Sequence, residues 1–159
     1  ILVYIIMALS FRSLLLPFTI LFSLPFALVG AALALYLTNS NLGISAMIGF
    51  MMLVGVVVTN GIVLMELVKQ LREKGDVTYD ALVNAGRTRL RPIWMTALTA
   101  ILALVPLATS QEAGAIIAAE LGKAVMGGLI VGTALTLIIV PVMYSFLDQV
   151  GDKIRGKSA

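Results

Sequence analysis

The sequence predicts an all-α, polytopic transmembrane helical bundle. Of its 159 residues, 60% are hydrophobic and only 12% are charged, which is not the composition of a water-soluble domain. It also contains apolar blocks of about 20 residues, the length that a helix needs to cross a hydrocarbon core of roughly 30 Å. We expect four complete membrane spans, over residues 17–37, 43–67, 92–109 and 122–147.

A further apolar stretch at the start of the chain, residues 1–9, is too short to cross a membrane. It has neither an initiator Met nor the charged segment that opens a signal peptide. We interpret residues 1–9 as the end of a truncated transmembrane helix, so the chain is expected to begin inside a longer protein.

The basic residues predict the orientation, because Lys and Arg in short loops stay on the cytoplasmic side. Arg12 precedes the first full span, a dense group of basic residues lies between the second and third spans, and further ones close the chain. Lys123 is alone on the opposite side. We therefore expect residues 69–91 and the tail at 148–159 in the cytoplasm, with residues 38–42 and the external loop at 110–121 outside.

Within the cytoplasmic link 69–91, apolar residues recur at helical spacing from Val77 to Ala85, and Gly86 follows them. The pattern predicts a short amphipathic helix that lies along the membrane surface and ends near Gly86. Its mixed charges favour a simple connector over a sensor of lipid head groups.

Several function classes are disfavoured by what the sequence lacks. Cys and His are both absent, which removes thiol and imidazole nucleophiles, disulfides and the usual zinc or copper ligands. The basic residues are not interleaved with aromatic residues as in a nucleic-acid surface. We expect no enzyme, no metal site, no cofactor and no nucleic-acid partner.

Small residues predict where the helices pack, because membrane helices approach closely at Gly, Ala and Thr. Gly128 and Gly132 lie one turn apart in the last span, on a ridge that also carries Ala124 and Thr136. A comparable surface in the first full span consists of Ala27, Gly30, Ala31 and Ala34.

The second full span carries a polar pair, Thr59 and Asn60, at its centre. Gly55 is one turn before Thr59, so a neighbouring helix could approach closely there. The pair could simply join helices through hydrogen bonds of about 0.6 to 2 kcal/mol each, or it could line a proton or ion pathway. A pathway needs an acid, and Glu66 lies too near the cytoplasmic end to serve.

The third span has a stripe of polar and small residues at spacings of three and four, which places them on one side of a helix. Arg89 shares this side with Thr96, and we expect the stripe to face the bundle interior. Together with the polar pair it would form a seam for a partner bundle that supplies a carboxylate. The stripe consists of Arg89, Pro92, Thr96, Thr99, Ala103 and Pro106.

The ordered segments FRSLLLP, MIGFMMLVGVVVTNGIVLMEL, RLRPIWMTALT and the closing MGGL through VPVMY resemble the C-terminal membrane half of resistance-nodulation-division (RND) efflux permeases. The resemblance covers nearly the whole chain. It implies half of a twofold repeated membrane domain: the end of the eighth transmembrane helix followed by helices nine to twelve.

The resemblance implies a drug/proton antiporter that exports amphiphilic or toxic small molecules, with H⁺ as coupling ion and no cofactor. The implied relay residues are Thr59, Asn60, Arg89 and Thr96, facing aspartates in the N-terminal half of the same permease. Multidrug members carry a Lys where this sequence has Thr59. Because that countercharge is missing and two adjacent carboxylates would repel, we expect only one relay aspartate.

The resemblance also implies a homotrimer in a bacterial cytoplasmic (inner or plasma) membrane, surrounded by lipid, with a periplasmic adaptor and an outer-membrane channel as possible partners. Two alternatives stay open: an RND-type metal exporter, or a non-transporting RND-like packing or export-helper protein. The eight methionines prompt the metal alternative, because thioethers suit Cu(I). These methionines are scattered and share no helix face, as the positions of five of them show: Met51, Met52, Met65, Met95 and Met143.

Overall fold

The computed structural model describes residues 1–112 and 114–155, and its regular elements are all α-helices. Four segments are long and apolar enough to cross a membrane, which confirms the predicted all-α membrane bundle. The first of them is made of two helices, α2 and α3. The elements are α1 (Leu2–Phe11), α2 (Leu15–Phe22), α3 (Leu24–Leu37), α4 (Ile44–Glu73), α5 (Thr78–Thr109) and α6 (Ile116–Arg155).

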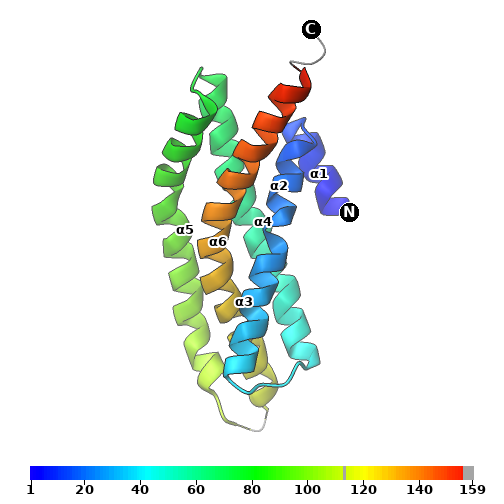
Figure 1. The fold of residues 1–159 in the computed structure, drawn as a ribbon. Coiled ribbons are helices and arrows are strands. Elements are labelled where there is room, and N and C mark those ends of the chain that lie inside the picture. Colours follow the sequence, from blue (N-terminus) through cyan, green and yellow to red (C-terminus); the bar gives the residue numbers. More distant parts are fainter. Residues whose placement is uncertain (113, 156–159) are drawn as a thin grey trace.

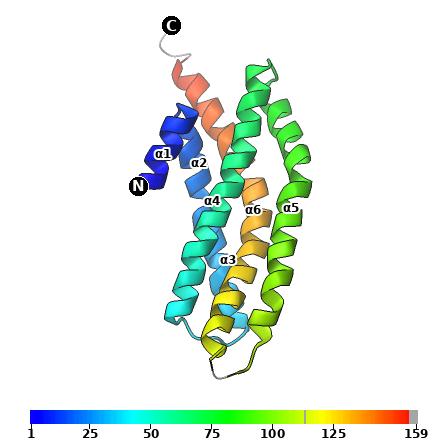
Figure 2. The same ribbon diagram turned by 180° about the vertical axis from the view of Figure 1, so that it is seen from behind.

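The long helices run up and down beside one another, and α6 is the helix against which the others pack. In Figure 1 α6 lies in front, between α5 and the α2–α3 segment, with α4 behind it. Figure 2 shows the opposite face, with α4 in front of α6. The short α1 lies beside α2, and both contact each other directly. One surface of α4 and one of α5 therefore face away from α6.

The first span is broken at Ser23, between α2 and α3. Pro25 lies at the start of α3, and a proline has no N–H to donate to the preceding turn, which kinks or ends a helix. The Ser23 hydroxyl donates a hydrogen bond of 2.7 Å to the carbonyl of Ile20, so it satisfies an acceptor at the break. The predicted single helix at 17–37 thus begins slightly earlier and consists of two pieces.

The contact between α3 and α6 is close because small residues meet there. A Cβ added to Gly30 would collide with Val131, and one added to Gly127 would collide with Ala34 and lie 3.1 Å from the carbonyl oxygen of Gly30. Ala27 and Ala31 are buried as well. The sequence marked this surface of the first full span as a packing face, and the structure places it against α6.

Residues 69–91, the predicted cytoplasmic link, fold differently from the prediction. Residues 69–73 complete α4, and the chain reverses at Gly75, whose φ of 101° lies in the left-handed region that favours glycine. The next helix, α5, then runs from Thr78 through Gly86 and Pro92 to Thr109. The prediction of a separate surface helix ending near Gly86, with a new span beginning at Pro92, was wrong.

Burial explains why α5 continues through both residues. Ala81, Leu82 and Ala85 are buried in the same cluster as residues of α4, so the apolar face of the link belongs to the bundle core. A glycine within a helix costs only about 1 kcal/mol relative to alanine. Proline is tolerated inside membrane helices where neighbouring groups satisfy the freed backbone.

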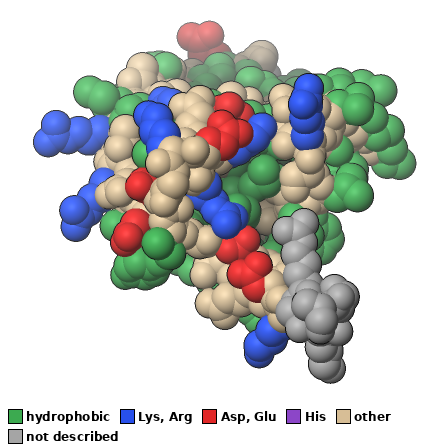
Figure 3. Space-filling view, turned by 90° about the horizontal axis from the view of Figure 1, so that it is seen from above, with side chains coloured by type: hydrophobic (Ala, Val, Ile, Leu, Met, Phe, Trp, Pro, Cys, Tyr) green, Lys and Arg blue, Asp and Glu red, His purple; other side chains and the backbone are tan. Residues whose placement is uncertain are grey.

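The last helix, α6, is longer at both ends than the predicted span 122–147. α6 begins at Ile116, so only the first part of the predicted external loop 110–121 is non-helical, and Ala113 lies outside the described residues. At the other end α6 runs to Arg155, so much of the predicted tail is helical, while residues 156–159 lie outside the described residues. Figure 3 looks onto the end where α4 passes into α5, and side chains of both charges gather there.

Candidate proton-relay seam

Thr59 and Gly55 lie on the outward surface of α4. Thr59 is exposed, and its hydroxyl donates a hydrogen bond of 2.8 Å to the carbonyl of Gly55, one turn earlier. A Cβ on Gly55 would have no described atom within 4 Å. The expected close neighbour of Gly55 is therefore absent from the described part of this chain, and this side of α4 is open.

Asn60 faces a different side of α4, because it is rotated by about 100° from Thr59. It lies three residues after Val57, which is buried and faces α6: the Val57 Cγ2 would be 3.4 Å from a Cβ on Gly132. Residues three apart are neighbours on a helix surface, and Asn60 is half-buried. The polar pair is thus divided, with Thr59 outward and Asn60 on the inner side.

On α5, Thr96 and Thr99 are exposed, and each hydroxyl donates to the carbonyl four residues earlier, at 2.9 and 2.8 Å respectively. The buried residues of this stretch are Ile93 and Ala97. The expectation that the polar stripe faces the interior was wrong for the part of the protein described. Apolar residues fill the contacts of α5 with α4 and α6, and the hydroxyls face outward.

Arg89 is half-buried, and its Nε is buried with no hydrogen-bond partner among the described residues. A guanidinium stays protonated in proteins, and an unsatisfied buried donor on a charged group costs several kcal/mol. We therefore expect Arg89 to be satisfied by a group outside residues 1–112 and 114–155. A carboxylate is the group that fits a guanidinium best.

The structure brings these residues onto two adjacent helices without joining them. α4 and α5 pack against each other, yet in the described residues the hydroxyls of Thr59 and Thr96 bond only within their own helices. We call Thr59, Asn60, Arg89 and Thr96 the seam. It is an open surface with one buried, unpartnered donor, which is the form expected of half a site.

The two glycines predicted for packing lie in helix contacts on α6. The nearest atoms to a Cβ on Gly128 would all belong to the side chain of Leu53 on α4, the closest being in collision. A Cβ on Gly132 would lie 2.9 Å from the Cβ of Ala27 on α3. Gly55 differs from both, since nothing in the described chain approaches it.

A polar cluster that sequence reasoning missed joins α4, α5 and α6 at the end of the bundle where α4 passes into α5; we call it the latch. Arg72 Nη1 donates to Asp148 Oδ1 at 3.0 Å and to the Tyr144 hydroxyl at 2.7 Å, and its guanidinium lies 5.9 Å from the Tyr144 ring centre. The Thr78 hydroxyl donates to Asp148 Oδ2 at 2.7 Å. The sequence contains one signal for this cluster: Tyr144 and Asp148 lie one helical turn apart, so one side chain can bind both.

Two further polar groups were also missed as candidates. The hydroxyls of Thr133 and Thr136 on α6 are buried and have no hydrogen-bond partner within the described ranges. Thr136 was assigned only to the small-residue ridge. A buried hydroxyl without a partner is unfavourable, so these two groups mark polar positions inside the contacts of α6.

Known proteins match this chain closely. The AcrB/AcrD/AcrF family matches residues 1–148. The chain is 48% identical over 155 residues to the swarming motility protein SwrC of Bacillus subtilis, covering 97% of this chain and 15% of SwrC. It is 44% identical over 122 residues to the cobalt-zinc-cadmium resistance protein CzcA of Cupriavidus metallidurans, covering 76% of this chain and 11% of CzcA.

The multidrug resistance protein MdtC of Erwinia tasmaniensis is 39% identical over 154 residues, which is 96% of this chain and 15% of MdtC. Among solved structures, a heavy metal efflux pump superposes with a TM-score of 0.83 at 33% identity, covering 93% of this chain and 15% of the pump. The chain thus spans 11–15% of the length of these relatives. The sequence resemblance is confirmed, and the chain belongs to the AcrB/AcrD/AcrF family of RND transporters, in which it forms part of the membrane portion.

Proposed function

We propose that this chain is the C-terminal membrane half of a proton-driven RND permease that exports amphiphilic or toxic small molecules. Membership of the family already shows that the chain is part of the membrane portion of an RND efflux transporter and is not an enzyme. We propose in addition that transport is coupled to protons and that the substrates are amphiphilic or toxic small molecules. Its main support is the buried Nε of Arg89, which has no partner among the described residues, two turns before the outward hydroxyl of Thr96 on the same side of α5.

The proposed partner of Arg89 is a carboxylate in the N-terminal half of the permease. When that acid is ionised, the guanidinium pairs with it, and the two membrane halves are held together at the seam. When the acid is protonated, the charge pair is lost and a different packing of the halves becomes favourable. A proton that crosses about 100 mV releases about 2.3 kcal/mol, which is enough to bias such a small difference.

Thr59 suits the protonated state of that acid. Its own hydrogen is donated to the Gly55 carbonyl, so its oxygen can still accept a hydrogen bond from a carboxylic O–H. A hydroxyl brings no positive charge, and Arg89 is the seam's only cation. We therefore propose that the N-terminal half supplies one relay aspartate, because a second adjacent carboxylate would lack a countercharge.

The test uses the complete permease reconstituted into vesicles with an imposed pH gradient. Arg89→Ala and Thr96→Ala should slow proton-driven substrate transport at a normal membrane level, while Arg91→Ala is the matched control. Arg91 lies two residues from Arg89 and is exposed, but it is not on the side of α5 that Arg89 and Thr96 share. Unchanged transport in both seam variants would count against the relay.

The organisation of the whole transporter follows from the same proposal. We propose a multi-pass protein of a bacterial cytoplasmic membrane, with the latch end inside the cell, assembled as a homotrimer and able to use a periplasmic adaptor and outer-membrane channel. Sequencing upstream of Ile1 is the direct check of the missing half. A matching membrane half with one aspartate on its fourth helix supports the proposal, and two adjacent aspartates contradict the single-acid relay.

A metal exporter is the second candidate, because CzcA is named for cobalt, zinc and cadmium resistance and the superposed structures are heavy metal efflux pumps. The methionines on the described helices do not favour it: Met51 and Met52 are exposed on α4, whereas Met65 is buried in the core. Transport assays with Zn²⁺, Co²⁺ and Cu⁺ beside a panel of amphiphilic dyes separate the two candidates.

A further inference from the structure

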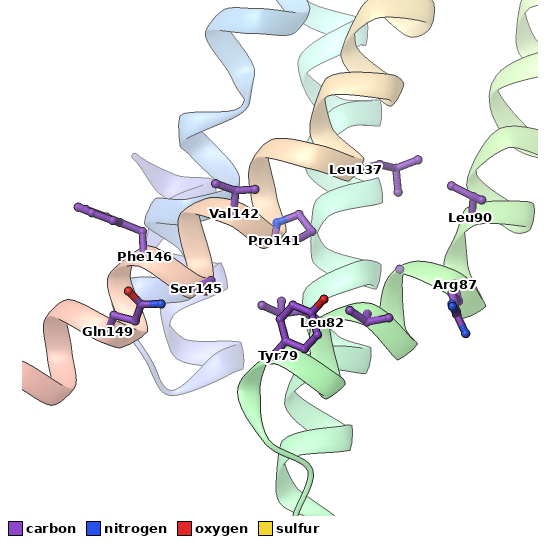
Figure 4. Close-up of a pocket in the computed structure, with 12 residues that line it drawn as sticks. Tyr79, Leu82, Arg87, Leu90, Leu137, Pro141, Val142, Ser145, Phe146 and Gln149 are labelled. Carbon is purple, nitrogen blue, oxygen red and sulfur yellow. The ribbon is translucent and has the colours of Figure 1, made fainter.

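An apolar groove separates the first turns of α5 from the last turns of α6. Its volume is about 630 Å³, within the range of about 300–1,000 Å³ typical of ligand sites. Figure 4 shows Leu90 of α5 facing Leu137 of α6, with Tyr79 and Leu82 on the α5 side and Pro141 on α6. Leu82 is buried at the floor, while Tyr79 and Phe146 are 73% and 59% exposed along the walls.

The groove is held open by contacts at both ends. At the cytoplasmic end, the Thr78 hydroxyl is bonded to Asp148 at 2.7 Å, which ties the start of α5 to α6. Deeper in the bundle, Ala100 and Ile101 of α5 pack against the cluster that contains Leu129 of α6. Contacts therefore tie α5 to α6 on both sides of the groove.

The surface of α5 at the groove is also unfilled. A Cβ added to Gly86, which lines the groove, would meet no described atom within 4 Å. The apolar walls of an open groove between membrane-spanning helices fit a lipid acyl chain, which keeps that apolar surface out of water.

The rim of the groove carries a cation. Arg87 lines the groove and is exposed, and the described residues offer it no ion pair; the pair they contain joins Arg72 to Asp148. In Figure 4 the Arg87 side chain extends away from Leu137 and Leu90, which face each other across the apolar part. Arg side chains near the ends of membrane helices place their charge at the lipid–water interface in this way.

The groove borders the seam on α5. Arg89 lies three residues after Gly86 and seven after Leu82, both of which line the groove, so Arg89 is at its edge. Arg87 and Leu90 of the groove point about 200° and 100° away from Arg89. The groove lies between α5 and α6, whereas Thr59 lies on the outward surface of α4. The inference about the groove rests on the proposed function in one respect, that the partner half covers Thr59 and leaves Arg87 open.

We propose that this groove binds an anionic phospholipid of the cytoplasmic leaflet, with an acyl chain along its apolar walls and the phosphate on Arg87. Three observations carry the proposal: the braced apolar walls, the open space before Gly86, and the unpaired cation at the rim. The cytoplasmic leaflet is the one rich in anionic lipids, and basic residues near its surface attract them. The assignment to this leaflet rests on the proposed orientation.

The test measures lipid binding to the purified complete permease by native mass spectrometry, with phosphatidylglycerol and phosphatidylcholine of the same acyl chains as probes. Wild type should bind phosphatidylglycerol about five-fold more tightly than phosphatidylcholine, and Arg87→Gln should remove that preference. Arg91→Gln removes a nearby exposed charge that does not line the groove, so it should keep the preference.

Gly86→Leu tests the apolar part by filling it. Because nothing lies within 4 Å of the new Cβ, the variant should fold, and it should lose one bound lipid of either type. Retention of that lipid in Gly86→Leu, or equal binding of both lipids by wild type and Arg87→Gln, overturns the proposal. Seam variants that lose proton-driven transport but bind lipid normally show that lipid binding in the groove does not depend on the proton relay.

Discussion

The packing of Gly128 against Leu53 allows a sharp test of how α6 and α4 fit together. All three nearest neighbours of a Cβ at position 128 belong to the Leu53 side chain, with Cδ1 at 2.8 Å and Cγ at 2.9 Å, and Leu53 is fully buried. Leu53 must shift to admit the new methyl group, and the side chains that bury it restrict that shift. We predict that Gly128→Ala destabilises the protein and that the loss in the double variant with Leu53→Ala is smaller than the sum of the two single losses.

The magnitudes follow from two opposing effects. Overpacking costs about 1–3 kcal/mol, and replacing a helical glycine by alanine returns about 1 kcal/mol, so Gly128→Ala alone should cost up to about 2 kcal/mol. Leu53→Ala alone should cost about 2–5 kcal/mol through the cavity it leaves. In the double variant the overpacking disappears, so the two effects should be non-additive by about 1–3 kcal/mol. The larger Gly128→Leu should lower the yield of folded protein.

The assay is thermal unfolding of the complete permease in detergent, followed by the loss of its size-exclusion peak. Gly151→Ala is the matched control, because Gly151 lies in the same helix and a Cβ there would meet nothing within 4 Å. The expected order of melting temperature is Gly151→Ala at or above wild type, then Gly128→Ala. A Gly128→Ala variant as stable as Gly151→Ala, or strictly additive effects in the double variant, would refute this account of the contact.

Three further predictions concern the seam and the latch. Arg89→Lys keeps a positive charge but loses the Nε donor and the planar fork, so vesicle transport should fall by less than in Arg89→Ala; equal loss in both would contradict a role for the charge. Asp148→Ala removes the acceptor of both Arg72 and Thr78, and for this partly exposed group we expect a loss of about 1 kcal/mol and a lower melting temperature; an unchanged melting temperature would show that the latch does not stabilise the fold. Gly55→Leu has no clash within the described chain, so the permease should fold but transport more slowly because the side chain projects toward the partner half; full transport would show that nothing contacts α4 there.

Helix existence could be predicted well because it depends on local properties of the chain. The length of each apolar block predicted the four spans, and the spacing of small residues predicted that α3 and α6 each carry a packing face. Both arguments use only the helical period and the thickness of a membrane. Neither requires knowledge of which helices become neighbours.

Helix boundaries were less predictable because they depend on burial. The sequence shows Gly86 and Pro92, which are typical of a helix end, but burial of Ala81 and Ala85 against α4 outweighs those local signals and keeps α5 continuous. The break at Ser23 is the opposite case. There Pro25 does interrupt the first span, although the apolar block is continuous in sequence.

By itself, then, the sequence determined that this protein is a bundle of four membrane spans, which polar residues it carries at membrane depth, and which family it resembles. Only the tertiary structure decided where those residues face: Thr59 and Thr96 outward, Asn60 on the inner side, and Arg89 with a buried donor that the described residues do not satisfy. The same is true of the latch, whose Arg72 and Asp148 are 76 residues apart. The physical reason is that periodicity fixes the angle between residues on one helix, whereas the direction of that helix face is set by contacts with helices far away in the chain.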